Sequence, residues 1–237
     1  MYAWLNDSIY GEISAYAAAK RGGAHPLDSS QGQTINGLAP YWRLAYESRW
    51  DRNSLSVGTY GIVVKMHPGN VDAQGNPLAL RGVTDRYRDV AFDTQYQFIG
   101  ENHIFSLLST YIDEKQSLDA SATNGLASNA NNDLKSFKIT GEYSYQRTIG
   151  GALGFFTTSG SSDATLYPAG DVVGSQTNSP DSRGFVAEVN YLPWLNTKLQ
   201  LQYVRYEKFN GLANNYDAAG RNAADNDTLY ALAWVNF

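Results

Sequence analysis

Apolar and polar side chains alternate along most of the chain, and a period of two residues is typical of β-strands with two unlike faces. Ten segments keep this alternation over a length that crosses an apolar layer, for which about 9 to 11 tilted residues suffice. We predict strands at 4–18, 40–51, 53–65, 86–100, 102–115, 134–148, 150–162, 182–194, 196–209 and 226–237. The pattern therefore predicts an all-β protein.

The connections between these segments alternate between short and long. Short connections such as Asp51-Arg52 and Gly100-Glu101 are typical of β-hairpins. The others are rich in Gly, Asn, Ser, Asp and Pro, at about 19–39, 66–85, 116–133, 163–181 and 210–225. A transmembrane β-barrel sorts its connections in this way, because tight turns close one side and solvated loops cover the other.

We therefore predict one antiparallel, up-and-down transmembrane β-barrel of about ten strands, formed by residues 1–237 as a single domain in a bacterial outer membrane. Both termini then lie on the periplasmic side. An even number of strands lets the last pair with the first, which leaves no free edge.

The apolar side of the alternation is expected to face lipid, because aromatic rings gather at its ends. Such rings gain from positions between lipid tails and headgroups. Trp42 and Trp50 are ~26 Å apart along a strand at ~3.3 Å per residue, or ~20 Å after a ~40° tilt, close to the ~25 Å apolar band of an outer membrane. The predicted girdle residues are Trp42, Trp50, Phe98, Tyr111, Tyr145, Tyr191 and Trp194.

The other side of the alternation is charged and is expected to face the lumen. The predicted lumen-lining residues are Glu12, Arg43, Glu47, Arg49, Asp89, Asp93, Lys138, Glu142 and Glu188. They favour either a polar channel with a slight preference for cations or paired charges that fill a narrow interior. A ring of ten strands has a backbone radius of ~10 Å, which inward side chains nearly fill, so packed pairs are favoured unless further strands widen it.

The C-terminus carries an alternating apolar stripe that ends in an aromatic residue: Leu229, Ala231, Ala233, Val235 and Phe237. This stripe resembles the signal that the barrel-assembly machinery reads on bacterial outer-membrane proteins. Val235 departs from the commonest form of that signal, which has an aromatic residue there, and Tyr230, Leu232 and Trp234 occupy the opposite side.

Composition removes several classes of function. The chain has no Cys and three His, which excludes thiolate zinc sites, iron–sulfur clusters and covalently attached haem. With 18 Lys+Arg against 23 Asp+Glu, the net charge of −5 argues against a nucleic-acid partner. No window has the roughly 18 apolar residues of a spanning helix. We expect no catalytic residue, no metal site and no cofactor within this chain, and outer-membrane lipid and the assembly machinery as partners.

Several stretches resemble the porin part of the fused monohaem outer-membrane cytochrome-porins. They are Asn6-Asp7-Ser8-Ile9-Tyr10, Pro40-Tyr41-Trp42-Arg43-Leu44-Ala45, Asp85-Arg86-Tyr87-Arg88-Asp89, Ser159-Gly160-Ser161, Asn215-Tyr216-Asp217 and Gly220-Arg221-Asn222-Ala223. In that family a haem-binding Cys-x-x-Cys-His segment precedes the barrel, and the fusion moves electrons across the outer membrane. The resemblance implies a porin-type barrel that is the C-terminal part of a longer precursor, with a haem domain or a periplasmic cytochrome as partner.

Two alternative functions remain. Some barrels are proteases that activate water with Asp and His at the loop-side rim, for which His25 or His67 with Asp28, Asp85 or Asp89 would be the candidates, although the expected pairing of acids is missing. The second alternative is a plugged structural or designed barrel without transport. Carboxylates in the long loops could bind hard cations, but turn formation explains them better.

Overall fold

The computed structural model describes residues 1–18, 33–69, 72–75 and 82–236. Within these residues the chain forms one twelve-stranded sheet and two short helices. The helices are α1 (Asp119–Thr123) and the 3-10 helix η1 (Ala223–Asn226). The strands are β1 (Tyr2–Leu5), β2 (Ile9–Tyr16), β3 (Thr34–Ile35), β4 (Ala39–Trp50), β5 (Asn53–His67), β6 (Asp85–Ile99), β7 (His103–Ser117), β8 (Asn131–Tyr145), β9 (Ile149–Gly160), β10 (Ser182–Trp194), β11 (Thr197–Lys208) and β12 (Thr228–Val235).

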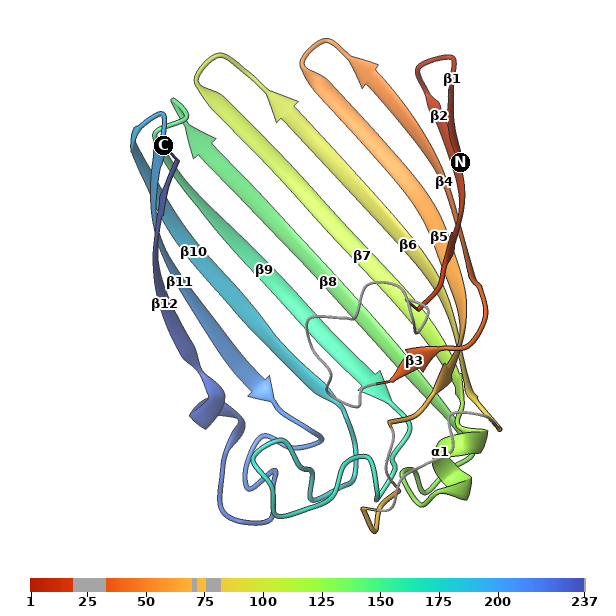
Figure 1. The fold of residues 1–237 in the computed structure, drawn as a ribbon. Helices are drawn as coiled ribbons and strands as arrows, with labels where there is room; N and C mark the ends of the chain where they lie inside the picture. The colour runs from red at the N-terminus through yellow and green to blue at the C-terminus, as the bar shows by residue number, and fades with distance from the viewer. Residues whose placement is uncertain (19–32, 70–71, 76–81, 237) are drawn as a thin grey trace.

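Each strand of the sheet pairs with its neighbours in chain order, and every pair is antiparallel. Among the described strands, only the short β3 is outside this order, and it pairs with the loop-side end of β5. The predicted all-β, up-and-down arrangement is confirmed. Figure 1 shows a strongly curved sheet with tight turns at one end, long connections at the other, and β1 and β12 as its two edges.

The first predicted segment, 4–18, is not one strand but a hairpin of β1 and β2. Asn6 and Asp7 have φ angles of 50° and 53°, and the Ser8 amide donates to the Leu5 carbonyl at 3.1 Å. Asn and Asp tolerate this left-handed conformation, and turns of this hand match the twist of paired strands. The extra strand makes β1 and β12 run in the same direction. The other nine predicted segments each coincide with one strand to within a few residues.

The pairing register carries one apolar face across the whole sheet. Ile13 lies opposite Trp42, Trp42 opposite Gly61, and Gly61 opposite Val90. Further along, Phe92 lies opposite Tyr111 and Tyr111 opposite Phe137. Because side chains alternate strictly along a strand, the remaining positions form a second face. We call these the apolar face and the polar face.

Neither described helix covers the apolar face. Both lie at the loop end of the sheet, where α1 packs against β6 and η1 against β11. The molecule therefore exposes 14885 Å², whereas a compact monomer of 26.1 kDa would expose about 10,600 Å². Of the described helices, none has both the length and the hydrophobicity to cross a membrane.

The fully buried large side chains lie mainly in the loop-side connections and not in the sheet. Tyr216 is completely buried, its ring packs edge-on against Phe209 at 4.8 Å between centroids, and its hydroxyl donates to the Val172 carbonyl at 2.9 Å. Leu118 and Ala223 are buried in the same region. These residues form a compact loop cap over one end of the sheet.

A buried carboxylate joins two of these connections. Asp163, which is 1 % exposed, accepts the backbone amides of Ser128, Asn129 and Leu166 at 2.9 to 3.0 Å and the Asn132 side-chain amide at 3.1 Å. Burial alone would raise the pKa of Asp163, but these hydrogen bonds to its ionised form hold the pKa well below its usual range. The charged carboxylate thus anchors the β7–β8 connection to the β9–β10 connection.

We expect Asp163→Asn to open this part of the loop cap, because an amide cannot accept all of these donors. The loss should be about 2–3 kcal/mol of local opening free energy, measured as hydrogen-exchange protection of the Ser128 and Leu166 amides. Asp171→Asn is the control, since Asp171 is exposed and accepts the Val172 amide.

The same carboxylate should make the cap sensitive to acid. Its folded-state pKa is depressed, so its contribution is complete above the ordinary carboxyl pKa of about 4 and is lost as the pH falls through the lowered value. Protection in the wild type that stays constant from pH 5 to pH 2 would contradict this role for Asp163.

Candidate functional site

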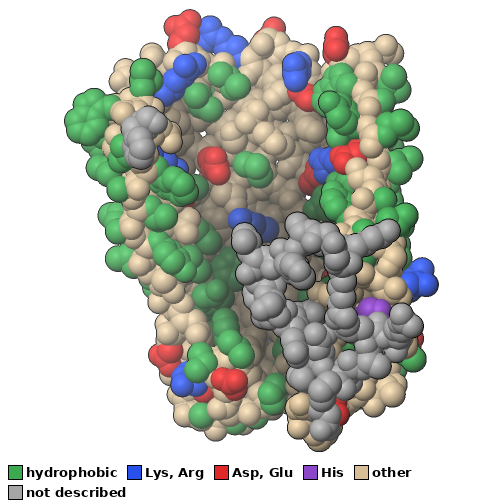
Figure 2. Space-filling model, in the orientation of Figure 1, with side chains coloured by type: hydrophobic (Ala, Val, Ile, Leu, Met, Phe, Trp, Pro, Cys, Tyr) green, Lys and Arg blue, Asp and Glu red, His purple; other side chains and the backbone are tan. Residues whose placement is uncertain are grey.

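All nine predicted lumen-lining residues lie on the polar face. Glu12 faces Arg43 across β2 and β4, and Glu142 and Glu188 both face Ala152 of β9. In Figure 2 charged side chains lie in the concave centre of the sheet, while hydrophobic side chains cover its outer flanks. The polar face is therefore the concave one. The nine residues are Glu12, Arg43, Glu47, Arg49, Asp89, Asp93, Lys138, Glu142 and Glu188.

An ion pair crosses one strand of the polar face. Arg43 of β4 donates to Asp93 of β6 from both terminal guanidinium nitrogens, at 2.5 and 3.0 Å, and the pair passes over Gly58 of β5. A Cβ at Gly58 would lie 2.8 Å from the Asp93 Oδ1 atom. The guanidinium also lies 5.3 Å from the centre of the Tyr60 ring. Glycine at this position thus gives the ion pair its space.

Most other charges on the polar face have local partners. Glu12 accepts the hydroxyls of Tyr10 and Ser14, each at 2.7 Å, and Arg49 pairs with Glu47. Glu188 accepts Gln202 at 3.1 Å and Asn190 at 3.2 Å, with Lys198 at 3.5 Å. Among the described residues, Lys138 and Glu142 have no hydrogen-bond or ion-pair partner, and the Oδ1 atom of Asp89 is buried without a hydrogen-bond partner.

A trough runs along the turn-side half of β9 on the polar face, because that half of the strand presents only Gly150, Ala152 and Gly154 there. The taller side chains of β8 and β10 stand on either side. Two adjoining depressions of about 360 and 250 Å³ follow the trough, and Glu142 and Glu188 line both of them. Lys138 lines the first and Lys198 the second. The trough is therefore open, polar and charged along its length.

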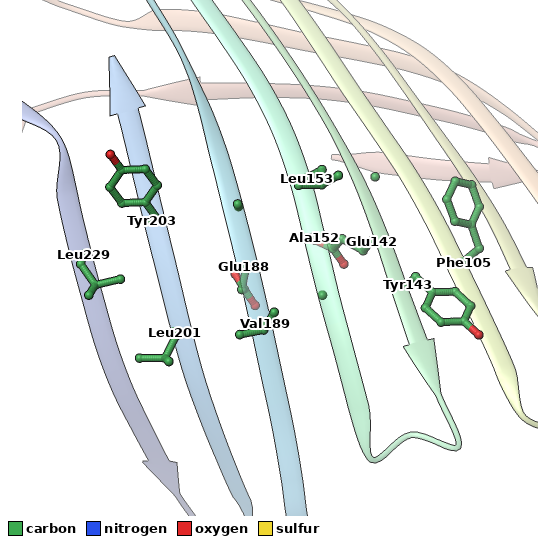
Figure 3. Close-up of a pocket in the computed structure, with 13 residues that line it drawn as sticks. Phe105, Glu142, Tyr143, Ala152, Leu153, Glu188, Val189, Leu201, Tyr203 and Leu229 are labelled. Carbon is green, nitrogen blue, oxygen red and sulfur yellow. The ribbon is translucent and has the colours of Figure 1, made fainter. Parts of the chain in front are cut away.

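The apolar face carries a groove of about 640 Å³ over β7 to β12. Its floor includes Gly141, Gly151 and Ala187, and Figure 3 shows larger side chains around it, with Glu142 and Glu188 directed to the other side of the sheet. The larger side chains are Phe105, Tyr143, Leu153, Val189, Leu201, Tyr203 and Leu229. Small residues on three adjacent strands create this hollow in the apolar surface.

The predicted girdle residues other than Trp194 lie on the apolar face by register: Trp42, Trp50, Phe98, Tyr111, Tyr145 and Tyr191. Trp42 also covers Gly61, where a Cβ would meet its indole nitrogen at 2.7 Å. The register shifts between Tyr191 and Trp194, and Trp194 pairs with Thr197.

The C-terminal stripe also follows the register. Leu229, Ala231, Ala233 and Val235 lie opposite Tyr203, Leu201, Leu199 and Thr197 on the apolar face. Tyr230, Leu232 and Trp234 lie on the polar face of the same strand, and Phe237 lies outside the described residues.

The residues considered for a rim hydrolase either lie apart from one another or bind other groups. His67 ends β5, and Asp85 accepts the amides of Ala120 and Ser121 at 3.0 Å as a cap for α1. His103 lies at the turn end, with its Nδ1 atom 2.7 Å from the Tyr143 hydroxyl. His25 and Asp28 lie outside the described residues. In the described part of the chain, no group of His, Asp or Glu has the geometry of a metal site.

Sequence reasoning missed Lys198 and Glu114 on the polar face. Lys198 lies two residues before Gln200, which the alternation already places on that side, so extending the alternation by one step would have found it. Glu114 lies opposite Asp89. It was missed because the alternation in segment 102–115 is weak.

No protein-family model matches the chain, and a search of curated proteins found no match to its sequence.

We expect Gly58→Ala to destabilise the fold by about 1–3 kcal/mol, because the methyl group overlaps the Arg43–Asp93 pair. Urea unfolding of the purified, folded protein measures the change. Gly11→Ala is the matched control, since a Cβ at that strand glycine meets nothing within 4 Å. In an Arg43→Ala/Asp93→Ala background the cost of Gly58→Ala should largely vanish, and an undiminished cost would refute the steric explanation.

Proposed function

We propose that the sheet is the wall of an outer-membrane β-barrel of porin type, with the apolar face toward lipid and the polar face toward a passive pathway. One observation carries the proposal: the apolar face is uncovered across the whole described sheet. Water is a poor solvent for such a face, since one-layer sheets normally bury their apolar side against a second layer. Lipid tails would replace that second layer.

The backbone supports the same proposal. Within the hydrocarbon layer, unpaired amides and carbonyls cost several kcal/mol each, so only helices and closed barrels cross it. Here neighbouring strands of up to 15 residues pair along nearly their full length. The tight turns and the long connections also lie at opposite ends of the sheet (Figure 1), which fits a barrel with a turn-side periplasmic end.

Closure into a barrel requires partners for the free edges of β1 and β12. Both strands run from the loop end toward the turn end, so a direct seam between them would be parallel. An odd number of additional strands would make every seam antiparallel and would widen the ring. In a wider ring the polar face lines water, because the ion pairs lie close to the wall and the trough over β9 stays open.

The polar face suits hydrated ions and small polar solutes. It presents carboxylates, ammonium groups and amides, and its described residues form no metal cluster. The resemblance to cytochrome-porins extends the proposal to a scaffold role, in which this wall surrounds an electron-transfer group that the chain itself does not contain.

A pair of variants in β10 tests which face meets lipid. Val189 lies on the apolar face and Val186 on the polar face of the same strand. We expect Val189→Lys to cost about 2–4 kcal/mol at the bilayer midplane and to reduce membrane-inserted protein strongly. Val186→Lys should insert normally. Urea-resistant outer-membrane protein and heat-modifiable migration in gels are the measurements.

The outcome is decisive in either direction. Equal insertion of the two variants would show that the apolar face does not contact lipid. Wild-type protein that stays folded and monomeric in buffer without detergent would overturn the membrane proposal altogether.

Conductance in planar bilayers tests the pathway. We expect ohmic current steps from the wild type, with a modest preference for cations because acidic groups outnumber basic ones on the polar face. Glu142→Gln/Glu188→Gln should lower that preference, measured as the reversal potential in a salt gradient. The same substitutions should leave insertion unchanged, and silent bilayers with correctly inserted protein would favour a plugged barrel.

A further inference from the structure

Basic side chains gather at the loop-side end of the apolar face. Seven of them lie near the loop-side ends of β5, β6, β7, β8, β10 and β11, and all are exposed: Lys65, Arg86, Arg88, Lys115, Lys135, Arg183 and Arg205. We call this set the basic belt. Its members continue the register of the apolar side chains, so they point outward and not into the concave polar face.

The register sets like charges directly opposite each other in the basic belt. Lys65 faces Arg86 across β5 and β6, and Arg88 faces Lys115 across β6 and β7. Cross-strand pairs of equal charge destabilise a sheet unless an anion lies between them. The two pairs are adjacent, and together they make a strip of four cations along three strands.

Carboxylates on the apolar face neutralise only part of the belt. Lys115 pairs with Asp133 at 2.8 Å and with Asp113 at 3.7 Å, and Arg183 pairs with Glu207 at 3.3 Å. The other five cations have no carboxylate partner among the described residues: Lys65, Arg86, Arg88, Lys135 and Arg205. The belt therefore keeps a net positive charge in a chain whose overall charge is −5.

The turn-side end of the apolar face is different. It ends in aromatic residues such as Trp50, Phe98, Tyr145 and Tyr191, and no Lys or Arg lies on this face near the turn-side ends of the described strands. The two ends of the apolar band thus meet different chemical environments. A bilayer with anionic groups concentrated in one leaflet would explain this asymmetry.

We propose that the basic belt binds the phosphate groups of a phosphorylated glycolipid, the lipopolysaccharide of the outer leaflet. This inference rests on the proposed function, which puts the loop-side end of the sheet at the outer surface. Arg and Lys bind phosphate through charge-assisted hydrogen bonds, and Arg binds it bidentately. Lipid phosphates lie just beyond the hydrocarbon, which is where the belt follows the apolar band.

The groove on the apolar face fits the same occupant. Tyr203 lines the groove, and Arg205 is the next outward residue of β11 toward the loops. Ala187 lines it on β10, and Arg183 lies beyond Phe185 on that strand. A phosphate held by Arg205 would place an acyl chain of the same lipid over the groove of about 640 Å³.

The test compares two double variants that each remove two positive charges. Arg88→Gln/Lys135→Gln alters the basic belt, and Lys138→Gln/Lys198→Gln alters the polar face. The protein, refolded in a zwitterionic detergent, is titrated with purified lipid A, and bound lipid is counted by native mass spectrometry. We expect the belt variant to lose affinity by about tenfold or more, and the polar-face variant to match the wild type.

Three results would overturn the proposal: equal affinity of the belt variant and the wild type, an equal loss in both variants, or equal binding of lipid A stripped of its phosphates. Failure of the proposed function is recognised separately. In that case Val189→Lys and Val186→Lys insert alike and the wild type needs no detergent. If only the lipid-binding proposal is wrong, Val189→Lys still inserts less well than Val186→Lys, and only the lipid A measurement departs from expectation.

Discussion

The apolar face of the sheet must be removed from water for this fold to be stable. A sheet that forms a single layer has two faces, and here the register gathers nearly all large outward side chains, from Ile13 to Leu229, on one of them. The exposed area exceeds that of a compact protein of this mass by about 4,000 Å². Buried side chains in the loop cap are too few to compensate. The solvent of the apolar face therefore decides the stability of the whole sheet.

The same constraint shapes the polar face. The apolar face carries Lys, Arg, Asp and Glu only near its loop-side end, so elsewhere the charged side chains of the strands lie on the polar face and become neighbours there. Arg43 and Asp93 form a pair over Gly58, while Glu188 accepts hydrogen bonds from Lys198 and from the side-chain amides of two neighbours. These partners hold the side chains close to the wall. The unpaired Lys138 and Glu142 lie beside the trough. The polar face therefore combines paired charges packed against the sheet with an open polar trough.

The alternation of apolar and polar residues predicted the strands well, because successive side chains of a β-strand point to opposite faces of the sheet. It was weaker where both faces are apolar: Ile104, Leu108 and Ile112 lie on the polar face of β7, and only the pairing with β6 and β8 reveals this. The turn at Asn6 and Asp7 was missed because apolar residues surround it. Contacts between connections were also out of reach, since the amide partners of Asp163 on Ser128 and Asn129 lie more than thirty residues away in sequence.

The basic belt is positively charged although the whole chain is acidic, because the loop-side carboxylates are engaged in hydrogen bonds within the loop cap. Asp85 caps α1, Asp163 binds backbone amides, and Asp217 accepts the amides of Ala219 and Arg221 and pairs with the Arg221 guanidinium at 3.0 Å. Hydrogen bonds lower the pKa of Asp217 against the opposing effect of burial. These carboxylates stabilise the loop cap and are not placed to neutralise the outward cations below it. An acidic chain can therefore present a basic surface at the one level where phosphate groups of a bilayer would lie.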